Sequence, residues 1–175
     1  KRPDLFSKLV LIEPAMVARP LATLVKLMPK KVMNKINPAK GTLTKADSFA
    51  SREDYLAYIK RFKGYHKFSD EMFELFTHHA IVPNTDGRFE LAFPKDWEAH
   101  NYTQPPNILP QLARLKMPVV AIRGKPGIFF SEKMWLLWQK SQPSSIYLED
   151  LDHGHLLPLE SPELCGNLIL EGLAK

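Results

Sequence analysis

The amino-acid sequence predicts an α/β protein with a small parallel sheet and a long, mostly helical insertion. Three apolar runs indicate strands buried on both faces, because they are rich in Val, Ile and Leu and do not alternate. The second and third runs flank an amphipathic segment, which favours two parallel strands joined by a right-handed crossover. The runs are KLVLI at 8–12, PVVAIR at 118–123 and SIYL at 145–148.

Two helices are expected beside these strands. The first lies in SEKMWLLWQKS at 131–141, where Ser131 is a good N-cap and an apolar stripe follows it. The second begins at Ser161-Pro162 and extends to about Gly172, because serine at the N-cap followed by proline is a typical helix start. The expected stripe of the first helix consists of Met134, Trp135, Leu137 and Trp138.

The segment between the first and second strands has a helical pattern. A basic amphipathic helix is expected at 19–36, divided by Pro29. Ser51 and Ser69, each followed by acidic residues, begin further helices, and NTDG at 84–87 is a turn. We interpret this segment as a lid. The expected organisation is a core strand in 1–14, a helical lid in 15–115, and the last core strands, histidine loop and final helix in 116–175.

Composition narrows the classes of function. The chain has 175 residues, 45% hydrophobic and 25% charged, with a net charge of +5. Its early lysines lack the interleaved aromatic residues of single-stranded nucleic-acid grooves, which argues against nucleic-acid binding. No apolar run approaches the ~18 residues of a membrane span, so no integral membrane association is expected. The lysine series Lys26, Lys30, Lys31 and Lys35 is either a solvated helix face or a contact for an anionic membrane surface.

The cysteine content bears on the cellular compartment. The single cysteine, Cys165, excludes an internal disulfide and lies in an apolar helical pattern typical of a buried thiol. The composition suits a reducing compartment, so we expect a cytoplasmic location, with the peroxisome as an alternative. The first residue is Lys1, and not Met, which suggests a processed or truncated start.

Polar residues follow each predicted strand, where ligands bind in open α/β sheets. Glu13 follows the first strand, GKPGI at 124–128 the second, and EDLDHGH at 149–155 the third. Histidine in a loop at the end of a strand favours a general base. A zinc site is disfavoured, since only two imidazoles occur together, and no cofactor is implied.

These segments resemble parts of α/β-hydrolases. DHGHLLPLESPE at 152–163 is similar to the segment that contains the catalytic histidine of that family, with His155 at the matching position and His153 at a variable one. PVVAIRG at 118–124 and PDLFSKLVLIEP at 3–14 resemble two of its strands, and SREDY at 51–55 and PKDWEA at 94–99 resemble a lidded subfamily that includes fungal peroxisomal lipase-like proteins. The resemblance implies the C-terminal portion of an α/β-hydrolase fold, with about three parallel strands, flanking helices and a lid.

The chain departs from the family pattern in two ways. It contains no G-x-S-x-G nucleophile motif, so the resemblance implies a nucleophile before residue 1 and an inactive segment when alone. The aspartate usual after "RG" is replaced at Gly127 or Ile128. Glu13 is therefore either the acid that orients His155 or a strand-end residue with backbone hydrogen bonds. Asp150 and Asp152 are weaker candidates for that acid, because acids of the same loop rarely reach the correct ring nitrogen.

The resemblance implies a serine hydrolase acting on carboxylic esters, lipid esters among them. Two alternatives stay open: a non-catalytic hydrolase-like protein that binds a small apolar ligand, and an epoxide or haloalkane hydrolase with an aspartate nucleophile. In each case the expected partner is a small ester or apolar molecule. Trp97 and Tyr102 either contact the acyl part of that molecule or pack within the lid.

Overall fold

The computed structural model describes residues 2–127 and 129–175. The chain divides into two compact units. Unit 1 comprises Lys1–Arg19 and Pro106–Lys175, and unit 2 comprises Pro20–Pro105. Unit 1 therefore contains all three predicted strands, and each unit is described separately below.

Unit 1 is built on a sheet of three parallel strands, as predicted, and their order in the sheet is β1-β5-β6. In register, Leu9 of β1 lies opposite Val119 of β5, and Val120 lies opposite Ile146 of β6. The strands are β1 (Leu9–Ile12), β5 (Val119–Arg123) and β6 (Ile146–Glu149). The helical elements are η1 (Pro3–Leu5), α7 (Leu109–Leu112), α8 (Glu132–Ser141), α9 (Leu157–Glu160) and α10 (Pro162–Ala174).

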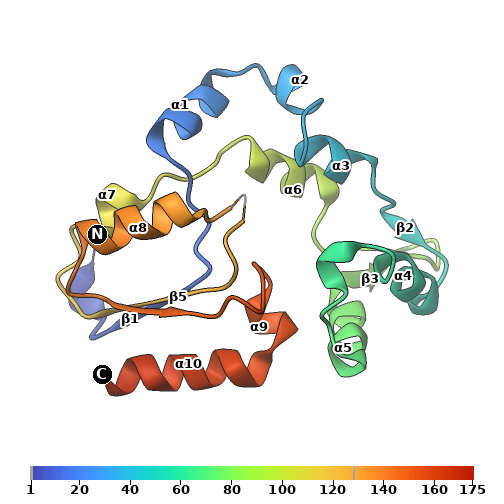
Figure 1. Ribbon diagram of the computed structural model, residues 1–175. Helices are drawn as coiled ribbons and strands as arrows, with labels where there is room; N and C mark the ends of the chain where they lie inside the picture. The colour runs from blue at the N-terminus through green and yellow to red at the C-terminus, as the bar shows by residue number, and fades with distance from the viewer. Residues whose placement is uncertain (1, 128) are drawn as a thin grey trace. The chain divides into compact units, whose positions relative to one another are not determined.

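Helices cover both faces of this sheet (Figure 1). Val119 and Ala121 of β5 pack against the α8 side, where Trp138 is fully buried. Val120 and Ile122 alternate to the other face and pack with Cys165 of α10. Because β5 is apolar on both faces, it forms the centre of the core, which accounts for its continuous hydrophobic sequence.

The apolar face of α8 is narrower than predicted. Ser131 is its N-cap, accepting a hydrogen bond from the Met134 N–H, as expected. Met134 and Trp138 are buried with Trp135, but Leu137 is exposed, so its inclusion in the stripe was wrong. Successive helical residues are about 100° apart, and Leu137 lies to one side of the face centred between the other three.

The two chain segments that connect unit 1 with unit 2 are hydrogen-bonded to each other. The Val17 N–H donates to the Pro106 carbonyl at 3.0 Å, and the Asn107 side-chain amide donates to the Val17 carbonyl at 2.7 Å. Nearby, Met16 and Phe130 form a parallel bridge and are both buried. The point where the chain leaves unit 1 and the point where it returns are therefore held together by hydrogen bonds.

Unit 2 is helical, but it also contains a small antiparallel sheet, with strand order β2-β4-β3, that was not predicted. Strands of two or three residues are too short to show an alternating pattern in the sequence. The turn predicted at 84–87 joins β3 to β4, with Gly87 at φ 75°. The strands are β2 (Ser48–Phe49), β3 (Ile81–Pro83) and β4 (Phe89–Leu91).

The helix starts of unit 2 agree with the sequence. Ser51 and Ser69 each cap a helix by accepting a backbone N–H, and Pro29 separates α1 from α2. The elements are α1 (Arg19–Leu27, its first residue in unit 1), α2 (Lys30–Met33), α3 (Ala39–Thr44), α4 (Arg52–Ile59), η2 (Lys63–Tyr65), α5 (Asp70–Ala80) and α6 (Lys95–Tyr102). Among the described residues, no helix has the length and apolar character to cross a bilayer.

Two glycines of α10 provide a matched test of how this helix packs. A Cβ at Gly172 would overlap the Val120 side chain, whereas a Cβ at Gly166 would meet nothing within 4 Å. We expect Gly172→Ala to lower the free energy of unfolding by about 1–3 kcal/mol through overpacking. Gly166→Ala should raise it by about 0.5–1 kcal/mol through helix propensity. Urea unfolding of both variants measures the difference, and equal effects would contradict this packing.

Candidate active site

The carboxyl ends of the three parallel strands of unit 1 bring the predicted polar residues together. Glu13 follows β1, Gly124 follows β5, and the segment from Asp150 to His155 follows β6. We call residues 150–155 the histidine loop. Because the strands are parallel and adjacent, their carboxyl ends lie at the same edge of the sheet, where ligands bind in open α/β folds.

Glu13 and His155 form a direct pair across this edge. The Oε2 atom of Glu13 lies 2.9 Å from Nδ1 of His155, although the residues are 142 positions apart in the sequence. The other carboxylate oxygen, Oε1, accepts the backbone N–H of Gly124 at 2.5 Å. Glu13 is buried, whereas the side chain of His155 is 40% exposed. Glu13 therefore accepts a backbone hydrogen bond and also contacts the His155 ring, while its function as the acid that orients His155 stays a prediction.

The backbone of Glu13 has an unusual conformation. Its φ is 46°, and it is the only non-glycine residue with positive φ in the described parts of the chain. For an L-residue other than Gly, Asn or Asp, this left-handed region costs about 1–2 kcal/mol. The Glu13 N–H still continues the sheet by donating to the Ile122 carbonyl at 2.9 Å. The strained turn therefore begins at the last ladder hydrogen bond and directs the carboxylate toward the strand ends.

The contacts of His155 define the chemistry available to its ring. A carboxylate can only accept a hydrogen bond, so the proton between the two groups belongs to Nδ1 of His155. In the neutral ring with its proton on Nδ1, Nε2 has the lone pair that can accept a proton. One face of the ring packs against Phe129, with ring centroids 4.9 Å apart and planes inclined by 35°. An imidazole held in this way can take a proton from a neighbouring hydroxyl or water.

The histidine loop is anchored to the segment after β5 by main-chain contacts. The Lys125 N–H donates to the His153 carbonyl at 2.6 Å. A Cβ on Gly124 would lie 2.5 Å from the Gly154 oxygen, so only glycine permits this close approach. The Gly154 N–H in turn donates to the Glu160 carboxylate at 2.6 Å. These contacts fix the backbone on either side of Gly154, and with it the position of His155.

A second acid–imidazole pair lies within the loop and was not recognised in the sequence. Oδ2 of Asp150 lies 2.5 Å from Nδ1 of His153, and Oδ1 accepts the Asp152 N–H. Burial by itself would raise the pKa of Asp150, but the His153 and Asp152 hydrogen bonds hold that pKa below its ordinary value. His153 is thus a structural partner of Asp150, and Asp150 does not contact the ring of His155 through any described hydrogen bond.

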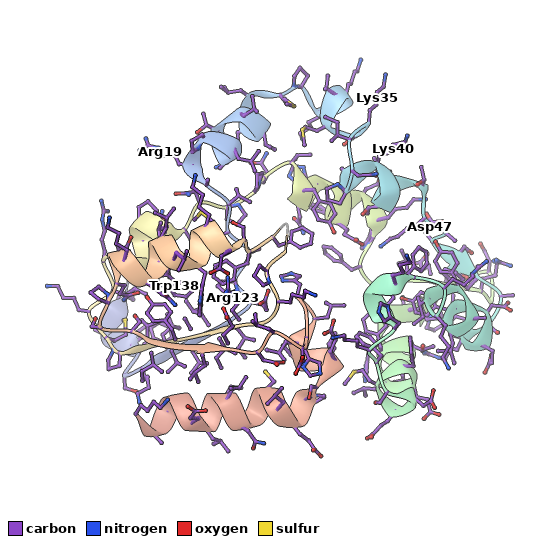
Figure 2. All side chains as sticks on the ribbon, in the orientation of Figure 1. Arg19, Lys35, Lys40, Asp47, Arg123 and Trp138 are labelled. Atoms are coloured by element: carbon purple, nitrogen blue, oxygen red, sulfur yellow. The ribbon has the colours of Figure 1, made fainter. Side chains whose placement is uncertain are left out.

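Arg123 supports the same edge from inside the sheet. It is 1% exposed, and its Nη2 donates to Glu132 of α8 and to Glu149 at the end of β6. Its guanidinium also lies 4.7 Å from the ring centroid of Trp135. Figure 2 labels Arg123 among the side chains of unit 1. The arginine therefore connects β5, α8 and the start of the histidine loop, since Asp150 N–H also donates to the Arg123 carbonyl.

Other residues singled out in the sequence lie elsewhere. Trp97 is 63% exposed, so the expectation that it packs inside the insertion was wrong for this residue. Tyr102 is half-buried in unit 2. Burial is the main cause that raises the pKa of its hydroxyl, and the negative charge of the nearby Glu98 is the second. Their contact with substrate stays a prediction. Gly127 stands in open space, and Ile128 lies outside the described residues. Within the described residues, no three His, Cys, Asp or Glu side chains form a metal site.

Comparison with known proteins identifies the fold. No protein-family model matches the chain, and no curated protein sequence matches it significantly. Solved structures do match. E-2-(acetamidomethylene)succinate hydrolase has a TM-score of 0.73 at 15% identity, over 99% of this chain and 59% of its own. The peroxisomal α/β-hydrolase Lpx1 of Saccharomyces cerevisiae has a TM-score of 0.69 at 18% identity, over 97% and 46%.

A thioesterase domain of the curacin biosynthetic pathway has a TM-score of 0.70 at 15% identity, over 97% of this chain and 59% of its own. The chain therefore spans about half the length of the structures that it matches. These similarities show that it has the fold of the C-terminal portion of α/β-hydrolases. They confirm the fold class that the histidine segment and the flanking strands predict.

Replacement of Asp150 tests the second pair. The lowered pKa means that the ionised carboxylate stabilises the fold fully above about pH 4, and that this contribution is lost as pH falls through the folded-state pKa. We expect Asp150→Asn to reduce the free energy of unfolding by about 1 kcal/mol at pH 7. Urea titrations should show the difference from wild type shrinking below about pH 4. Asp152→Asn is the matched control, because the exposed Asp152 side chain makes no described hydrogen bond.

Proposed function

We propose that the protein containing this chain is a serine hydrolase of carboxylic esters, in which His155 transfers the proton and Glu13 orients His155. The serine nucleophile is supplied by residues outside this chain, as is the oxyanion hole. The proposal rests on one observation above all, the 2.9 Å hydrogen bond between Glu13 Oε2 and His155 Nδ1 at the carboxyl edge of the sheet. The hydrolase and thioesterase structures that share the fold support hydrolysis as the reaction class.

The proposed reaction follows from which nitrogen is free. As the serine oxygen attacks the ester carbonyl carbon, Nε2 of His155 accepts the hydroxyl proton. The imidazolium keeps its Nδ1–H directed at the Glu13 carboxylate, whose negative charge stabilises the positive ring. The same proton then passes from Nε2 to the departing alkoxide, leaving an acyl-enzyme. A water molecule activated by Nε2 releases the acid and restores the serine.

Glu13 is suited to this function because its position requires no reorganisation. Oε1 is already bound to the Gly124 N–H, so the carboxylate plane is fixed before any substrate binds. The buried setting excludes water from this acid and strengthens its interaction with a protonated ring. A glutamate in this position makes an aspartate after β5 unnecessary, which is consistent with glycine at position 127.

Ester hydrolysis by the full-length protein tests the proposal. We expect His155→Ala to lower kcat for a p-nitrophenyl ester by about 10³-fold or more, and Glu13→Gln to lower it by at least about 10²-fold. His79→Ala is the matched control, since His79 is an exposed histidine at the end of α5 and has no proposed function. Thermal unfolding of each variant separates loss of chemistry from loss of fold. Activity that is indifferent to His155→Ala would overturn the proposal.

Relocation of the acid provides a stricter test. Gly127 has no positive φ and a Cβ there meets nothing within 4 Å, so an aspartate can be accommodated. It would stand at the position at which the family resemblance expects the acid. We expect Glu13→Gln with Gly127→Asp to recover at least about tenfold of the activity lost in Glu13→Gln alone. Gly127→Asn in the same background is the control for size, and equal recovery by asparagine would exclude an orienting carboxylate.

A further inference from the structure

The net positive charge of the chain arises from one segment. Residues 14–46 contain no aspartate or glutamate but include seven of the 24 lysines and arginines. Without these seven, 17 cationic residues face 19 acidic ones, so the rest of the chain has a net charge of −2. The segment therefore changes the net charge of the chain from negative to positive. The seven residues are Arg19, Lys26, Lys30, Lys31, Lys35, Lys40 and Lys45.

Most of these cations have no acidic partner. Lys45 is paired with Glu98, but within the described ranges the other six make no ion pair. The lysines among the six are exposed. Figure 2 labels Lys35 and Lys40, which extend from the chain around α2 and α3. The electrostatic potential of this surface is thus not neutralised within unit 2.

Exposed apolar side chains occur in the same segment. Leu21, Leu24 and Leu27 of α1 are 49%, 54% and 78% exposed. They recur every third residue, so they form one stripe along the helix, with Lys26 on nearly the opposite side. The exposed side chains of Val32 and Ile36 continue the apolar character beyond Pro29. These leucines form an exposed apolar strip along one side of α1.

We propose that residues 21–40 form a docking surface for an anionic lipid bilayer. We call this segment the basic surface. The leucine stripe of α1 enters the boundary between headgroups and acyl chains, and the lysines bind the lipid phosphates. Interfacial helices combine these two features, a cationic side and a leucine side, and bind without crossing the bilayer. Both features are needed, because lysines supply attraction to negative lipids and leucines supply the apolar area that is removed from water.

The composition of the segment favours lipid over the other polyanions that lysines bind. No phenylalanine, tyrosine or tryptophan occurs between Phe6 and Phe49, so the segment has no aromatic side chain to stack on nucleic-acid bases. A nucleic-acid backbone would also leave the leucine stripe of α1 in water. An acyl boundary covered by anionic headgroups satisfies the lysines and the leucines simultaneously.

Vesicle co-sedimentation of the full-length protein tests this proposal. We expect binding to vesicles of phosphatidylcholine with 30% phosphatidylserine, and at least about tenfold weaker binding to phosphatidylcholine alone. Replacing Lys26, Lys30, Lys31 and Lys35 with glutamine should weaken binding to the anionic vesicles by about a hundredfold or more. Leu21→Gln with Leu24→Gln should weaken it by at least about tenfold at unchanged charge.

Matched variants keep the test specific. Glutamine at the exposed Lys63, Lys116, Lys133 and Lys140 lowers the net charge equally and should leave binding within about twofold. Glutamine at the exposed Leu136 and Leu170 is the control for the leucine variant. Circular dichroism verifies that each variant is folded. Equal losses in the control variants, equal binding to neutral vesicles, or no binding would overturn the proposal. In the last case, dimerisation lost on changing Leu21 and Leu24 would identify a second copy of this chain as the occupant.

Discussion

The carboxylate of Glu13 is the group on which the arrangement of the sheet edge depends. Burial of a charge costs several kcal/mol unless hydrogen bonds replace its water. Here one oxygen accepts a hydrogen bond from the Gly124 N–H and the other contacts His155. The Glu13 side chain therefore connects the segments that follow β1, β5 and β6. If the histidine loop moved away, Oε2 would be buried without a partner. The desolvation cost of the acid therefore opposes movement of the loop.

The fold of unit 1 could be predicted because its signals are local. Buried parallel strands appear in the sequence as short apolar runs. Ser131 indicates the start of α8, because its N-cap hydrogen bond involves only the next few residues. Glu13 and His155 could each be placed at a strand end for the same reason. Their pairing could not be decided from the sequence, since it depends on the left-handed backbone of Glu13 and the N–H of Gly124.

Other features were missed because they arise from three-dimensional packing. The Asp150–His153 pair lies in a loop without periodic structure, where spacing of residues does not show which side chains meet. The antiparallel sheet of unit 2 is built from strands too short to alternate. The exposure of Trp97 and Leu137 was missed for the same reason. A large apolar residue in a helix is buried only if it lies on the helix face that packs against the core, and the sequence did not identify that face for these two residues.

The hydrogen bonds between Val17, Pro106 and Asn107 have a consequence for how such a protein can change over evolution. Because the entry and exit of unit 2 already meet within unit 1, the length of the segment between them has little effect on the sheet. The entropy of closing a loop grows only with the logarithm of its length, and here the closure is made by unit 1 itself. The 86 residues of unit 2, Pro20–Pro105, are in this sense a module. Evolution or an engineer can exchange it while the hydrogen bonds at the strand ends of unit 1 are left intact.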